Sequence, residues 1–352
     1  SRWSRASAST RAPRSSTTRR KRPMYEVLMF DGGVYRISEL YELVEDIGGF
    51  VIQKTQIQVM ITATIAIPAE DRPVIEAKTR ELGGKLIEVP LAGTEIAVVG
   101  PTLGRHHMPH PICDIAEQLR KYGAITVVMG LARGKGRQTA QISADEKAFI
   151  EEYDAAVFVL GNFADCILKD KVRLFERIEI PVTVVCGPEI SGLPNCEALV
   201  CGVGRKVERM RRAEEIAKLE ETARAVQRVV QARKEEIDED PLYVHPAEVK
   251  QRIENLELVM QSLRPAPIVL HLDGLRVKVP YEQVKDQLCD VDIYGRKLCD
   301  ISTIAPSRLG GSTIVRILTK AQVASKDAKV LVDRATEPMT ALGTGSKEVR
   351  RP

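Results

Sequence analysis

The chain has 352 residues, of which 44% are hydrophobic and 28% are charged, an ordinary composition for a globular protein that folds in water. This length exceeds what one hydrophobic core usually serves, so we expect two or three domains. No apolar run approaches the roughly eighteen residues of a membrane helix, so we expect no part of the chain to cross a bilayer. The seven cysteines form no C-x-x-C pair, which argues against a secreted disulfide scaffold and favours the reducing cytoplasm.

The net charge of +4 comes from residues 1–23, which hold eight basic residues and no acidic one. The rest of the chain is net acidic. A basic, serine-rich segment is typical of a transit peptide, of a disordered nucleic-acid arm, or of an upstream stretch translated by mistake. Because Met24 leads directly into an apolar run, we favour the third interpretation and expect the natural start at Met24.

Residues 24–92 are predicted to form a ferredoxin-like α/β unit. Strand-like runs alternate here with helical patterns that end at glycine pairs, and Ser38 is predicted to cap the first helix. The expected elements are strands at 25–30, 50–67 (a long strand or a hairpin) and 85–90, and helices at 38–46 and 71–82. A β-α-β-α-β order over about 70 residues is the basis for this prediction.

Residues 93–204 are predicted to form a mostly parallel, doubly wound α/β sheet. Short strands that are apolar along their whole length are typical of parallel sheets covered by helices on both faces. The expected elements are strands at 96–100, 125–130, 155–160, 182–186 and 198–203, and helices at 113–122, 145–153 and about 166–177.

The last third of the chain is predicted to contain a long charged helix at 205–237 and a small α+β domain at 238–335, followed by a tail at 336–352. Apolar residues at helical spacing within 205–237 indicate a connecting helix that packs one face on a neighbour. In the small domain we expect a helix at 246–262 and strands at 268–278 and 312–320.

The segment from Gly104 to Asp114 has the densest group of metal-binding side chains, and it follows the first strand of the predicted parallel sheet. Sites in such sheets form beyond the carboxyl ends of the strands. Cys113 and Cys166 are favoured because a helix N-terminus stabilises a thiolate, which is the form that binds iron. The full set of candidate metal ligands is His106, His107, His110, Cys113, Cys166 and Cys196.

The alternative is a loop whose imidazoles cap backbone groups and whose cysteines pack as small hydrophobic residues. Cys186 and Cys201 lie in apolar strands and are expected to be buried. Cys289 and Cys299 lie in another domain and are expected to be structural.

A basic loop follows the strand that ends at Gly130 and carries Arg133, Lys135 and Arg137. Backbone amides and cations there could bind an anion, or the loop could be a solvated turn or a protein-docking patch. It is not a P-loop, because the spacing to Lys135 is short and Gly136 replaces the Ser or Thr that holds magnesium. We therefore expect no nucleotide in this chain.

Several segments of the sequence resemble those of a known protein family: residues 24–35, 89–96, 105–114, 130–134, 157–163 and 272–278. Through these segments the chain resembles the methanogenesis marker protein 7 family over essentially all of 24–335. Residues 1–23 have no counterpart in that family.

The resemblance implies a subunit of the ATP-dependent complex of methanogenic or methane-oxidising archaea that activates methyl-coenzyme M reductase by reducing its nickel to Ni(I). It also implies large iron–sulfur clusters, similar to the nitrogenase cofactor precursor and shared with partner chains. The implied partners are the reductase subunits, other methanogenesis marker proteins and an ABC-type ATPase component. We expect neither nucleic acid nor a membrane as a partner.

Two hypotheses follow from the residues and the resemblance together. The chain is either an electron-transfer subunit that contributes ligands to an iron–sulfur cluster, or a non-redox scaffold that docks the reductase and its partners. An independent enzyme has no motif in its support. The resemblance does not say which residues of this chain bind a cluster.

Overall fold

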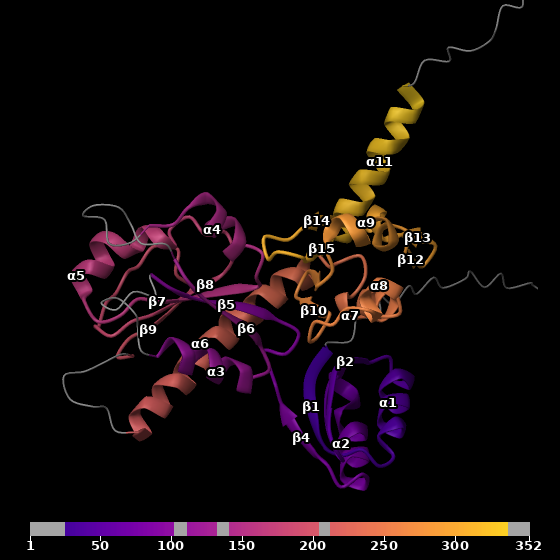
Figure 1. Cartoon of the computed structure of the whole chain (residues 1–352), viewed down its shortest axis with the longest axis horizontal. Helices are drawn as coiled ribbons and strands as arrows, with labels where there is room; N and C mark the ends of the chain where they lie inside the picture. Colours follow the sequence, from indigo (N-terminus) through magenta and orange to yellow (C-terminus); the bar gives the residue numbers. More distant parts are fainter. Residues whose placement is uncertain (1–24, 102–110, 132–140, 204–211, 337–352) are drawn as a thin grey trace, which may run out of the picture.

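The computed structural model of the chain describes residues 25–101, 111–131, 141–203 and 212–336 (Figure 1). These residues form a mixed α/β protein with one parallel sheet, antiparallel sheets on either side of it in the sequence, and one long helix. None of the described helices is long and apolar enough to cross a membrane.

The N-terminal unit is an antiparallel sheet with the strand order β2-β3-β1-β4, covered on one face by two helices. The run that was predicted as a long strand or a hairpin is a hairpin, which turns at Gln58 with a φ of 54°. The elements are β1 (Tyr25–Gly33), α1 (Ile37–Asp46), β2 (Phe50–Ile57), β3 (Met60–Pro68), a 3-10 turn (Ala69–Asp71), α2 (Arg72–Glu81) and β4 (Lys85–Glu88).

The predicted parallel sheet is confirmed, and its strand order is β6-β5-β7-β8-β9. The chain runs from β5 outward to β6 and then crosses to β7 on the other side of β5. The direction of winding therefore changes between β5 and β7, and this switch point is where open α/β sheets bind ligands. The strands are β5 (Glu95–Gly100), β6 (Ile125–Gly130), β7 (Ala155–Val159), β8 (Val182–Val185) and β9 (Ala198–Val200).

Helices cover both faces of this sheet because alternate residues of each strand point to opposite sides. Ile96 and Val98 of β5 pack in one core with α3 (Ile112–Lys121) and α6 (Arg212–Glu239). Ala97 and Val99 pack in a second core, which includes residues of α4 (Ala144–Ile150) and of the segment that follows β7.

The helix predicted at about 166–177 is not continuous. It consists of α5 (Ala164–Cys166), one π-helical turn (Ile167–Lys171) and one 3-10 turn (Val172–Leu174). The long helix predicted at 205–237 is described from Arg212 and extends to Glu239 as α6, and it packs on α3 and on the ends of β8 and β9.

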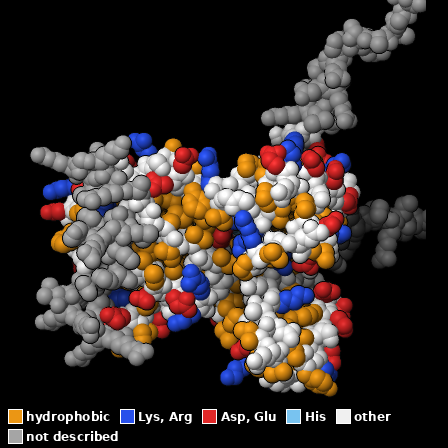
Figure 2. Space-filling view, in the orientation of Figure 1, with side chains coloured by type: hydrophobic (Ala, Val, Ile, Leu, Met, Phe, Trp, Pro, Cys, Tyr) orange, Lys and Arg blue, Asp and Glu red, His pale blue; other side chains and the backbone are white. Residues whose placement is uncertain are grey.

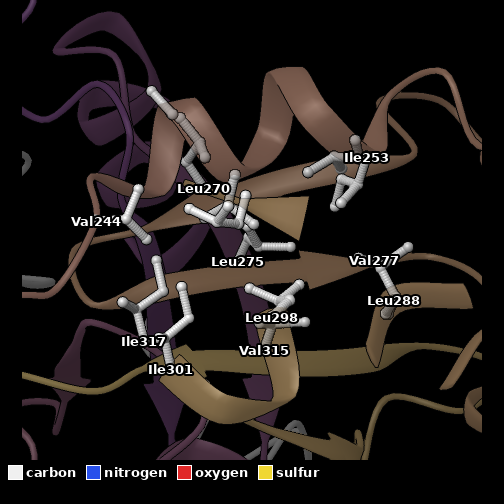
Figure 3. Close-up of a cluster of buried hydrophobic side chains, with 14 of the residues drawn as sticks. Val244, Ile253, Leu270, Leu275, Val277, Leu288, Leu298, Ile301, Val315 and Ile317 are labelled. Carbon is white, nitrogen blue, oxygen red and sulfur yellow. The ribbon is translucent and has the colours of Figure 1, made fainter. Parts of the chain in front are cut away.

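The C-terminal unit is an antiparallel sheet with the order β10-β11-β15-β14, and Figure 3 shows the side chains that fill its core. Ile52 and Ala66 of the N-terminal sheet belong to the same core, so the first and last units pack together. The elements are α7 (Pro246–Ile253), α8 (Glu257–Met260), β10 (Ile268–His271), β11 (Gly274–Val277), α9 (Tyr281–Cys289), β12 (Asp292–Ile293), β13 (Arg296–Lys297), α10 (Leu298–Ile301), β14 (Ser302–Pro306), β15 (Thr313–Ile317) and the projecting α11 (Lys320–Thr336; Figure 1).

Candidate functional site

A row of glycines marks the carboxyl edge of the parallel sheet. A glycine ends each strand or lies within two residues beyond it: Gly100, Gly130, Gly161, Gly187 and Gly202. Glycine lets the backbone turn sharply and lets another group approach it closely. These glycines lie at or near the ends of the strands predicted from the sequence, so the row is a signal that the sequence already contains.

Three of these glycines form a connected rim. Gly161 and Gly202 have φ values of 84° and 78°, which favour glycine. Gly187 packs against Asn162, whose Oδ1 would lie 2.2 Å from an added Cβ. The Gly187 amide donates to the Gly161 carbonyl at 2.9 Å, and the Gly202 amide donates to the Gly187 carbonyl at 3.1 Å. The loops beyond β7, β8 and β9 are therefore held to one another by backbone hydrogen bonds.

Cys113 and Cys166 both lie at this edge, on either side of the switch point. Cys113 is exposed in the first turn of α3, the helix after β5, and Cys166 is partly exposed at the end of α5, which follows β7. Since β5 and β7 are neighbours, the two cysteines come from adjacent strand ends. They belong to helical segments that cover opposite faces of the sheet.

Lys171 is a buried cation beneath the same edge, with only 3% of its surface exposed. It is the last residue of the π-helical turn, and its Nζ donates to the Leu160 carbonyl at the end of β7. Burial lowers the pKa of the Lys171 amine, while the nearby Cys166, Asp170 and Cys186 oppose this effect. Sequence reasoning missed Lys171, because only the π-helical turn distinguishes it from the exposed Lys169.

Cys186 and Cys201 follow β8 and β9, and their Sγ atoms lie 3.9 Å apart. Cys186 is buried as expected, with 1% exposed, and burial raises the pKa of its thiol to about 12. Cys201 is partly exposed, contrary to the expectation that it would be buried.

The structure does not bring Cys196 to this edge. Cys196 precedes β9, whereas the other candidates follow their strands, so it lies at the amino end of the sheet. Its Sγ donates to the Ala198 carbonyl at 3.1 Å, and burial raises the pKa of its thiol. Cys289 and Cys299, expected to be structural, form a disulfide between α9 and α10 of the C-terminal unit.

Six of the predicted site residues lie outside the described residues: His106, His107, His110, Arg133, Lys135 and Arg137. Within the part of the chain that the structure describes, no three His, Cys, Asp or Glu side chains lie together as a metal site. Cys113 and Cys166 therefore do not form a metal site with other described side chains.

The amino edge of the sheet holds a buried ionic network that sequence reasoning did not find. Arg276 of β11 donates to Glu95 of β5 at 2.9 Å and to Glu152 at 2.8 Å. His271 Nε2 lies 2.9 Å from the same Glu95 carboxylate. Asp154 accepts from the backbone amides of Glu95 at 2.7 Å and of Leu272 at 2.8 Å. These contacts connect the C-terminal unit to the parallel sheet.

A pocket of about 320 Å³ lies beside this network, and its lining includes six acidic residues together with Arg233 and Arg316. Arg316 of β15 pairs with Asp273 and donates to the Glu152 carbonyl. The charged groups of this region are largely paired with one another, which is typical of a contact between domains. We therefore take the carboxyl edge, where glycines, thiols and a buried lysine meet, as the candidate site.

Three matches place the chain among known proteins. The family model described as methyl-coenzyme M reductase operon protein C matches residues 25–291. An uncharacterized protein of Methanocaldococcus jannaschii is 44% identical over 301 residues, which are 85% of this chain and 96% of that protein. The methyl-coenzyme M reductase I operon protein C of the same organism is 28% identical over 102 residues, which are 26% of this chain and 51% of that protein.

Proposed function

The chain belongs to the methyl-coenzyme M reductase operon protein C family, and from this premise we propose that it is a subunit of the complex that reductively activates methyl-coenzyme M reductase. The family description and the methanogen relatives support a role tied to methanogenesis. The segments that resemble methanogenesis marker protein 7 support the more specific role in activation.

The role of the chain in this complex is proposed to be ligation of an iron–sulfur cluster in the electron path. The observation that carries this proposal is that Cys113 lies at the start of the helix after β5 and Cys166 in the helical segment after β7, two neighbouring strands on either side of the switch point. Cysteine thiolates are the usual ligands of iron–sulfur clusters, and the common clusters take four of them.

The described residues supply two such thiols and do not complete a cluster site by themselves. We therefore propose that further ligands come from His106, His107 or His110, in the segment that follows β5, or from a partner chain. Such a shared cluster agrees with the large clusters that the resemblance implies. The basic segment with Arg133, Lys135 and Arg137 follows the neighbouring strand β6, and we propose that it contacts an anion or a partner at the same edge.

The test is anaerobic purification of the chain with the reductase and the other activation components. Cys113→Ser and Cys166→Ser should each lower the iron content of the complex and abolish activation, because serine is a poor replacement for a soft thiolate. Cys196→Ser is the matched control, since Cys196 lies at the other end of the sheet. Full iron content and full activation in the first two variants would contradict the cluster proposal.

The second candidate function is a non-redox scaffold, and the β2–β3 hairpin favours it. Ile57, Val59 and Met60 at its tip are 70%, 69% and 50% exposed, and hydrophobic side chains are visible on the surface of the N-terminal unit (Figure 2). Exposed apolar groups of this kind mark docking surfaces. If the cysteine variants keep their iron and their activity, Val59→Lys should still weaken co-purification with the reductase.

A further inference from the structure

Two free thiols lie next to each other immediately beyond the ends of two neighbouring parallel strands. Val185 of β8 pairs with Val200 of β9, and Cys186 and Cys201 are the next residues beyond the two strands. Backbone hydrogen bonds also join the two segments beyond the strand ends: the Cys186 amide donates to the Val200 carbonyl at 3.0 Å, and the Val203 amide donates to the Cys186 carbonyl at 3.0 Å. Backbone hydrogen bonds therefore hold the two segments side by side where the cysteines lie.

This position suits a disulfide. Neighbouring strands lie about 4.8 Å apart, within the range of about 4.4–6.8 Å that separates the Cα atoms of bonded cysteines. The Sγ atoms are 3.9 Å apart, so a rotation of the side chains brings them to bonding distance. The backbone hydrogen bonds of β8 and β9 remain in place during this change.

The two thiols differ in access to solvent. Cys186 is buried, and its pKa is raised to about 12, so its thiol is protonated at neutral pH. Cys201 is partly exposed, and its Sγ contacts the Ile190 carbonyl at 3.7 Å as well as the Cys186 thiol. An accessible thiol beside a buried one is the arrangement in which the first attacks a disulfide and the second completes the exchange.

Metal binding and a simple packing role explain this pair less well. No third His, Cys, Asp or Glu of the described ranges completes a metal site with the two thiols. Packing alone does not require two cysteines at adjacent strand ends, or a partly exposed one. Cys196, the nearest cysteine in the sequence, lies at the other end of β9 and donates to Ala198.

We propose that Cys186 and Cys201 form a redox-active dithiol that reduces low-molecular-weight disulfides. The Cys201 thiolate attacks one sulfur of the disulfide RSSR, so that a mixed disulfide Cys201–SR forms and one thiolate leaves. Cys186 then loses its proton to solvent and attacks Cys201 Sγ, so that the second thiolate leaves and the Cys186–Cys201 disulfide forms. The protein loses two electrons and two protons, and RSSR becomes two RSH. The reverse exchange with thiols restores the dithiol.

The experiment uses the isolated full chain without iron or partners, so its outcome is independent of the proposed role in reductase activation. The chain is equilibrated anaerobically with mixtures of reduced and oxidised glutathione, quenched with acid and alkylated. Digestion after glutamate separates the three cysteines, because Glu189 lies between Cys186 and Cys196 and Glu197 lies between Cys196 and Cys201. Mass spectrometry then identifies each linked pair of peptides.

We expect a Cys186–Cys201 link whose amount rises with the share of oxidised glutathione. Cys196→Ser should leave this link unchanged, and Cys186→Ala should instead trap glutathione on Cys201. Absence of the link in the wild-type chain under fully oxidised glutathione would overturn the proposal, as would a link between Cys196 and Cys201 in its place. The wild-type result decides the proposal even if a variant fails to fold.

Discussion

Arg276 has no exposed surface and contacts two carboxylates of the parallel-sheet unit, Glu95 and Glu152. Burial disfavours its charge, but these carboxylates more than offset that effect and raise the pKa of the guanidinium. The side chain also lies over the ring of Tyr153. At the scale of single residues, this arginine and its partners hold the C-terminal unit against the sheet.

We expect Arg276→Met to lower the free energy of unfolding by about 3–5 kcal/mol, because removing one partner leaves buried carboxylates without their counter-charge. Chemical denaturation at pH 7 measures this loss. Arg224→Met is the matched control, since Arg224 pairs with Glu220 on the exposed surface of α6, where such pairs contribute little. Equal losses in both variants would show that the buried network does not stabilise the fold.

The stability of the chain should also depend on the ionisation of Glu95. Burial favours its protonated form, but His271 and Arg276 outweigh burial and hold the pKa of Glu95 below its ordinary value of 4.5. Because the pKa of Glu95 is lower in the folded state, its carboxylate stabilises the folded protein at pH values above 4.5. This stabilisation is lost as the pH falls below 4.5 and through the lowered pKa of the folded state. The neighbouring Asp154, whose pKa burial raises, acts with the opposite sign.

We therefore expect the stability difference between wild type and Glu95→Gln to be large at pH 7 and to shrink as the pH falls below 4.5. Because Asp154 is present in both proteins, comparing them removes most of its effect. The measurement is denaturant unfolding at a series of pH values. A difference that stays constant with pH would contradict the role assigned to the Glu95 carboxylate.

At the scale of secondary-structure elements, α4 and α1 begin in different ways: α4 has a side-chain cap and α1 has none. Ser143 precedes α4 and forms a capping box, in which its hydroxyl accepts from the Glu146 amide at 3.1 Å and the Glu146 carboxylate accepts from the Ser143 amide at 2.8 Å. Ser38, predicted to cap the first helix, lies inside α1 instead. That helix begins at Ile37 after Arg36, whose left-handed conformation starts the helix without a side-chain cap.

We predict that Ser143→Ala lowers the free energy of unfolding by about 1 kcal/mol, the usual value of a side-chain cap. Ser38→Ala is the control, and it should leave stability unchanged or slightly higher because alanine favours helix interiors. Thermal unfolding followed by circular dichroism distinguishes the two. A larger loss in Ser38→Ala would restore the original capping prediction.

The sequence predicted the strands of the parallel sheet better than its helices or its site. Runs such as Ile96–Gly100 are apolar throughout, so their burial could be read directly. The sequence did not show that the segment from Ala164 to Leu174 divides into three different helical turns. Whether a turn has π or 3-10 hydrogen bonds depends on tertiary packing, which the spacing of apolar residues does not reveal. The same turns bury Lys171, which is why that residue was missed.

The sequence predicted at which edge of the parallel sheet the candidate site lies, but not which face of the sheet each cysteine-bearing helix covers. The order of elements indicated that Cys113 and Cys166 follow strands of one parallel sheet, and the structure places those strands side by side. The strand order that makes them neighbours, and the opposite faces on which their helices lie, depend on long-range packing. The pairing of Cys186 with Cys201 likewise depends on β8 and β9 being adjacent.

At the scale of the whole molecule, the first and last units share one core. Phe50 of β2 stacks on His245, which caps α7, with ring centroids 5.1 Å apart, and Tyr25 lies within 5.5 Å of both rings. Ile52 and Ala66 are buried in the core of the C-terminal unit. The N-terminal sheet therefore supports α7 and the sheet behind it.

We expect Phe50→Ala to lower the free energy of unfolding by about 2 kcal/mol or more, since it removes a large side chain at this contact. Calorimetry should show the N-terminal and C-terminal units unfolding together in both wild type and variant. Phe163→Ala is the control, because Phe163 is 72% exposed and its loss should change little. Separate transitions for the two units would contradict their shared core.

The contact between the first and last units also bears on synthesis. The ribosome makes β3 about 180 residues before α7, and at roughly 5–20 residues per second this interval lasts about 10–40 s. During that time Ile52 and Ala66 have no C-terminal unit to cover them. The nascent chain therefore exposes this apolar face of the N-terminal sheet to solvent until the C-terminal unit has been synthesised and can cover it.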